Sequence, residues 1–86
     1  MEWMTGQVVQ SRKGRDTARW YVVLGCAGER LQLADGRKFT RENPKNKNPW
    51  HVNPTATVLP CGEIEDDAGI RKALAALAAK APVQGG

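Results

Sequence analysis

The chain has 86 residues, so it forms one small domain, and its sequence carries a formal net charge of +4. A chain this short buries only about 60–65% of its unfolded surface, which disfavours a deep catalytic cleft. No uninterrupted apolar stretch approaches the roughly 18 residues of a membrane span, and no basic-then-apolar signal segment opens the chain. We therefore expect a cytoplasmic protein with no membrane partner.

The positive charge is concentrated in the first two thirds of the sequence. Residues 1–54 carry ten Lys or Arg and five acids, a net charge of +5, whereas residues 55–86 carry three bases and four acids, a net charge of −1. This asymmetry favours an anionic partner for the first segment. The alternative is that the charge serves only solubility.

The first half of the chain reads as short strands separated by turns. Residues 5–11 and residues 19–24 have β-branched or aromatic runs typical of strands, and residues 25–28, with two glycines, break the pattern. Residues 31–33 alternate apolar and polar side chains, and the Asp35-Gly36 pair predicts a type I′ hairpin turn. Residues 37–40 are then the expected returning strand.

The segment from residue 42 to residue 54 is rich in Asn and Pro, and we expect it to be mostly loop. Residues 50–52 have room for one short strand between prolines, and residues 55–59 are expected to form the last strand. Closure of four or five such strands into a small barrel would remove exposed strand edges. The fold class is therefore all-β, with a barrel over residues 1–60.

Residues 61–86 are expected to form an acidic turn, an amphipathic helix and a flexible tail. Asp66 or Asp67 offers a helix N-cap, and Ile70, Leu74 and Leu77 lie on one helix face. Lys80 and Pro82 are helix stop signals. This helix would pack on the barrel or serve a partner.

The chemistry-bearing residues do not suggest an enzyme or a cofactor. Cys26 and Cys61 stand apart from each other and from His51, so we expect two reduced thiols, with Cys26 packed as a small hydrophobe, and no metal. The acids at Glu63, Glu65, Asp66 and Asp67 fit a helix start better than a general acid/base pair. We expect no catalytic residues and no cofactor.

The most basic stretch of the chain joins the first two expected strands. Residues 6–24 read GQVVQSRKGRDTARWYVVL, and this run resembles a KOW motif, a glycine- and valine-bearing strand followed by a basic loop and a second valine-bearing strand. The likeness is nearest to KOW proteins related to archaeal and eukaryotic large-subunit ribosomal proteins, including short bacterial members. The chain departs from the family at Thr17-Ala18, where many members carry Lys-Gly, and at Trp50, where a basic residue is expected.

The resemblance implies an SH3-like barrel of about five strands that binds RNA, commonly ribosomal RNA, and so a ribonucleoprotein role in translation. Ribosomal proteins are further expected partners, and the free chain is expected to be a monomer. Arg and Lys on an exposed loop suit phosphate contacts, and glycine makes backbone N–H groups accessible. The expected RNA-binding residues are Arg12, Lys13, Gly14, Arg15, Arg19, Trp20, Arg37, Lys38, Lys45 and Lys47.

Several alternatives to this interpretation remain open. The basic loop can also be read simply as a solvated loop that contacts no RNA. The same alternative applies to the positive charge that Arg41 continues toward Lys47. Tyr21 and Val23 are expected to face the core, so Trp20 faces outward, either to stack on a base or to cover the barrel rim or the terminal helix. The alternative function is an SH3-like protein-interaction module that uses the Trp-bearing Asn-Pro loop and the helix.

Overall fold

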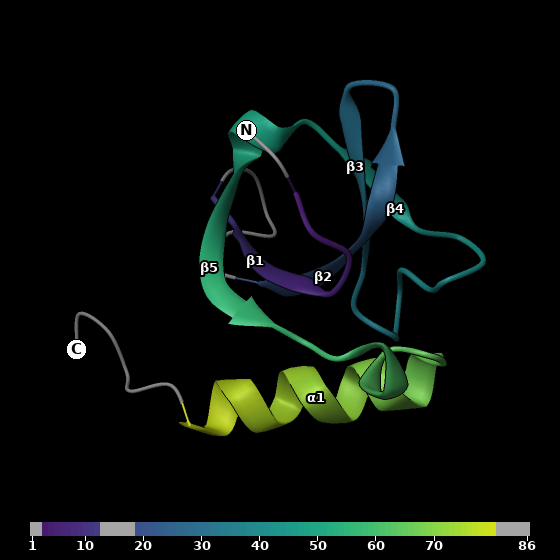
Figure 1. Ribbon diagram of the computed structural model, residues 1–86, viewed down its shortest axis with the longest axis vertical. Coiled ribbons are helices and arrows are strands. Elements are labelled where there is room, and N and C mark those ends of the chain that lie inside the picture. The colour runs from purple at the N-terminus through teal and green to yellow at the C-terminus, as the bar shows by residue number, and fades with distance from the viewer. Residues whose placement is uncertain (1–2, 13–18, 81–86) are drawn as a thin grey trace.

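The protein folds as one curved antiparallel sheet with a C-terminal helix beneath it (Figure 1). The computed structural model describes residues 3–12 and 19–80. The sheet has five strands in the order β4-β3-β2-β1-β5. The strands are β1 (Gln7–Ser11), β2 (Trp20–Ala27), β3 (Arg30–Ala34), β4 (Lys45–Lys47) and β5 (Val52–Val58).

The sheet is rolled, because its two edges are joined by a short link. Only residues 48–51 separate the edge strand β4 from the opposite edge strand β5, and residues 49–51 form a 3₁₀ helix, η2 (Pro49–His51). A flat five-stranded sheet would be about 19 Å wide. A link of this length with a helical turn spans no more than about 15 Å. The prediction of a mostly β fold with about five short strands and a C-terminal helix is therefore confirmed, and the rolled open sheet is consistent with a small barrel-like fold.

Rolling the sheet creates two hydrophobic clusters, one on each face. Inside the curl, the buried residues are Val9, Tyr21, Val23, Leu31, Leu33 and Val52. Between the sheet and the helix, they are Val8, Val22, Ala34, Leu59, Ile64, Ile70, Ala73 and Leu74. Since β2 is buried on both faces, its consecutive apolar residues show no polar alternation.

The C-terminal helix α1 (Asp67–Lys80) follows a 3₁₀ turn, η3 (Cys61–Glu63), and lies along one side of the curved sheet (Figure 1). Asp66 caps it, since its Oδ1 accepts the Gly69 N–H at 2.7 Å. Ile70 and Leu74 are buried and Leu77 is half-buried against the same cluster. The predicted cap and apolar helix face are both confirmed, and the helix packs on the sheet.

The expected hairpin at Asp35-Gly36 is wrong. Asp35 Oδ1 accepts the N–H groups of Arg37 and Phe39 at 2.9 and 3.1 Å, which makes a compact local turn. The chain after this turn runs toward the start of α1, and no strand forms over residues 37–40. Gly36 is needed for another reason: its φ is +79°, and a Cβ there would overlap the Asp67 carbonyl oxygen.

Four other expectations also need correction. β2 continues through residues 25–27, with a bulge between Val23 and Gly25, and the chain turns only at residues 28–29. The partner of β3 is β4, inside the segment expected to be loop. Residues 50–52 are not a strand of their own, because they divide between η2 and β5. Cys26 is an exposed free thiol near the end of β2 rather than a packed core residue.

Candidate nucleic-acid interface

Arg12 and Arg19 stand where β1 ends and β2 begins, and both are exposed. The Ser11 N–H donates to the Arg19 carbonyl at 2.9 Å, and the Arg12 N–H donates to the His51 carbonyl at 3.0 Å. These bonds fix the backbone on both sides of the basic connection. The predicted residues Lys13, Gly14 and Arg15 lie outside the described residues.

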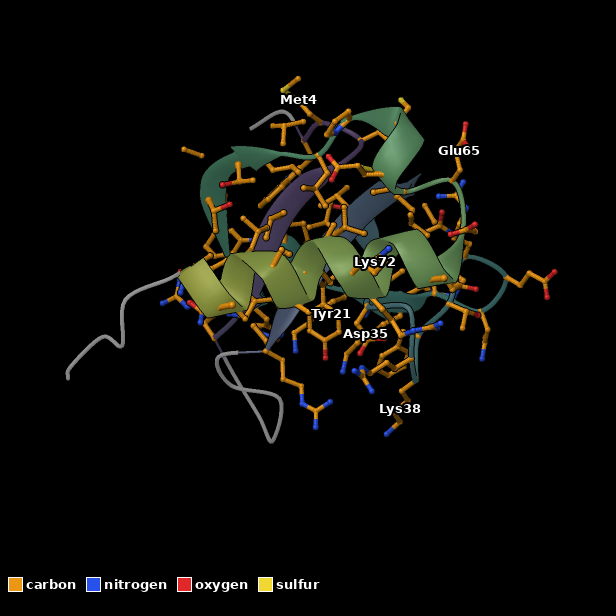
Figure 2. All side chains as sticks on the ribbon, turned by 90° about the horizontal axis from the view of Figure 1, so that it is seen from below. Met4, Tyr21, Asp35, Lys38, Glu65 and Lys72 are labelled. Carbon is orange, nitrogen blue, oxygen red and sulfur yellow. The ribbon has the colours of Figure 1, made fainter. Side chains whose placement is uncertain are left out.

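Lys38 and Lys45 are held over aromatic rings at the same end of the sheet. The Lys45 ammonium lies 4.8 Å from the Phe39 ring centre and 5.9 Å from that of Tyr21, and Lys38 lies 5.6 Å from that of Phe39. Tyr21 and Phe39 meet edge-on, with 6.2 Å between ring centres. Figure 2 shows Tyr21, Asp35 and Lys38 together on one side of the molecule, away from Met4. The two ammonium groups are thus positioned by cation–π contacts.

Lys47 connects one edge strand to the start of the basic connection. Its Nζ donates to Ser11 Oγ at 3.1 Å, which brings β4 across the curl to the end of β1. Ser11 is buried, with 2% of its surface exposed. Arg37 is exposed next to Lys38. We call the following described cations the basic rim: Arg12, Arg19, Arg37, Lys38, Lys45 and Lys47.

Arg41 and the predicted RNA-binding residue Trp20 have mainly structural contacts. Arg41 belongs to the helix side, because its guanidinium donates to the Ile64 carbonyl and its N–H donates to Asp67 Oδ1 at 2.9 Å. Trp20 is half-buried and packs against the cluster between the sheet and the helix. That contact favours the second alternative for Trp20, in which its ring covers the terminal helix.

A shallow groove of about 500 Å³ lies next to the basic rim, around Trp50. Its lining comes from three separate segments: Trp3, Arg12, and the run Pro49, Trp50, Val52, Asn53 and Pro54. The sequence placed Trp50 only in the protein-interaction alternative and gave no role to Trp3. The available signal was Asn48-Pro49, a cap residue followed by a proline suited to the first position of a helical turn.

Among the described residues, no group of three or more His, Cys, Asp or Glu is placed to hold a metal ion. Within the same residues, no helix combines the length and apolar character needed to cross a bilayer. No protein-family model matches the chain, and no curated protein is significantly similar to it.

Proposed function

We propose that this chain is a non-catalytic RNA-binding module with an SH3-like barrel of the KOW type. The basic rim and the connection between β1 and β2 contact RNA phosphates. Ribosomal RNA is the target class that the KOW resemblance implies, and ribosomal proteins are its neighbours there. Five short strands in one rolled sheet are compatible with the SH3-like assignment.

One observation carries the proposal most: cations from separate segments of the curled sheet are each held in place by a specific contact. Lys45 and Lys38 rest over Phe39, and Lys47 is bonded to Ser11, beside the ends of the basic connection. A phosphate backbone presents regularly spaced negative charges, so it gains from several ordered cations on one surface. Ordering them in the free protein reduces the side-chain entropy lost on binding.

The salt dependence of RNA affinity tests the proposal. If about four to six phosphates of a single strand are neutralised, log affinity against log salt should have a slope of about −3 to −4. Changing Arg15 and Arg19 together to Gln removes two charges from the connection. The slope should then become shallower by about one to one and a half units.

The matched control is the double change Lys72→Gln and Lys80→Gln, which removes the same charge from α1. Figure 2 shows Lys72 on the helix, whereas Lys38 lies at the edge of the molecule below it. We expect the control to keep the wild-type slope. Equal slopes for the wild type, the Arg15/Arg19 variant and the control would show that the connection does not contact phosphate.

A further inference from the structure

Trp50 is presented to solvent on a rigid turn. Its side chain is 81% exposed, the largest exposed fraction among the exposed large hydrophobic residues Met4, Trp50 and Val58. Asn48 Oδ1 accepts the Trp50 N–H at 3.0 Å, and the Asn48 carbonyl accepts the His51 N–H at 2.9 Å. Pro49 fixes φ at the first position of this turn. The backbone is thus ordered by local bonds, while the ring is available for a ligand.

The groove on one side of Trp50 has an apolar floor and a charged rim. Val52 is 3% exposed and Trp3 packs against the cluster inside the curl, so both are anchored in the core. Pro49 and Pro54 add apolar surface, and Arg12 and Asn53 supply polar groups. The result is a flat apolar site with a cation and an amide at its edge.

Two further hollows border the same ring, and Arg12 supplies the positive charge beside Trp50 that no acid of the lining offsets. Arg12 and His51 line the second hollow, and Arg30 lines the third together with Glu29. The Arg12 N–H donates to the carbonyl of His51, the residue after Trp50. Arg12 therefore remains next to the ring and also begins the basic connection.

We propose that Trp50 and its groove bind one unpaired base of an RNA strand, with Arg12 on the adjoining phosphate. This inference rests on the proposed function and adds a single-strand site to it. A nucleotide combines a flat apolar face with an anion, the combination that Trp50 and Arg12 match. A strand whose base stacks there also continues onto the basic rim, whereas a proline-rich peptide would match the apolar floor but leave the cations unused.

The test compares Trp50→Ala with the wild type by fluorescence anisotropy on three labelled probes. These are a single-stranded RNA of about ten nucleotides, an abasic strand of the same length, and a blunt RNA duplex. Losing one stacked base should weaken single-strand binding roughly 5- to 150-fold. Affinity for the abasic strand and the duplex should stay the same, and the salt slope should not change, because no charge is removed.

Two further variants serve as controls. Trp50→Phe keeps an aromatic face and should recover most of the affinity. Met4→Ala removes another exposed apolar side chain, 58% exposed and not part of the groove lining, and should bind as the wild type does. Unchanged melting temperatures for all three variants would exclude unfolding as the cause.

The other outcomes separate this inference from the proposed function. If Trp50→Ala binds the single strand like the wild type, the stacking site is wrong while the basic rim stands. If the wild type binds none of the probes, both proposals fail. An equal loss on the abasic strand would mean that Trp50 does not read a base. Binding of a proline-rich peptide that Trp50→Ala abolishes, with single-strand affinity intact, would assign the groove to a protein partner.

Discussion

The guanidinium of Arg71 on α1 donates a 2.6 Å hydrogen bond to the carbonyl oxygen of Gly36. Together with the bond from Arg41 to Asp67 Oδ1, it fastens the segment between β3 and β4 to the first turns of the helix. The helix is therefore bound to the sheet by polar contacts as well as by its apolar face. This relationship makes Gly36 a sensitive position.

We expect Gly36→Ala to destabilise the protein strongly. The left-handed φ of +79° disfavours any side chain by about 1–2 kcal/mol, and the added Cβ would overlap the Asp67 carbonyl oxygen. That overlap adds about 1–3 kcal/mol. Gly28→Ala is the matched control, because Gly28 has a φ of +63° and open space around it. Urea unfolding of both variants should show the difference, and equal losses would contradict the close approach of helix and loop.

The apolar face of α1 should contribute according to burial. Ile70 is fully buried, so Ile70→Ala should lower the free energy of unfolding by about 2–5 kcal/mol. Leu77→Ala removes the same number of side-chain atoms at a half-buried position, and it should lower the free energy of unfolding by less than half as much. Chemical denaturation gives both values. A Leu77 variant as unstable as the Ile70 variant would mean that the helix end packs more deeply than described.

Removing the helix should unfold the domain. A chain that stops after Gly62 exposes Val8, Val22 and Ala34, which the helix otherwise covers. We expect its thermal unfolding to lose cooperativity, as followed by circular dichroism and calorimetry. A synthetic peptide of residues 63–80 should restore the transition when added. Cooperative melting of the shortened chain alone would show that the rolled sheet is independent of the helix.

Trp20 and Trp50 should behave in opposite ways. Because Trp20 packs against the cluster between sheet and helix, Trp20→Ala should lower stability by about 1–3 kcal/mol. RNA affinity, measured where the variant is folded, should change less than about twofold, since the stacking site lies elsewhere. A stable Trp20→Ala protein with weakened single-strand binding would instead make Trp20 a base-stacking residue.

The parts of the fold that the sequence predicted are those specified by local patterns. β1, β2 and β3 have β-branched or alternating residues, and α1 has a cap and an apolar face, so neighbours along the chain are sufficient to indicate them. β4 is Lys-Asn-Lys, which has little strand propensity. It becomes a strand because Leu31 and Leu33 of β3 supply its partners.

The candidate site also has one part that the sequence could predict and one part that it could not. The cations could be identified from composition and from the KOW resemblance. The groove could not, because Trp3, Arg12 and Trp50 become neighbours only when the sheet rolls and η2 bridges its edges. The bond from Arg41 to the Ile64 carbonyl was likewise invisible in the sequence, because its partner lies 23 residues further along the chain.

The order of strands in the sheet also sets when the protein can fold during its synthesis. Among the five strands of the described residues, β1 is made first, and it lies between β2 and β5, which is made last of the five. The hydrogen bonds along one edge of β1 cannot all form before Val58 has been made. Val8 stays uncovered until α1 has been made and packs on the sheet. Pairing between distant segments slows folding, and translation adds only about 5–20 residues per second. The nascent chain thus keeps an open strand edge for seconds, until β5 and α1 have been made and can pack on β1.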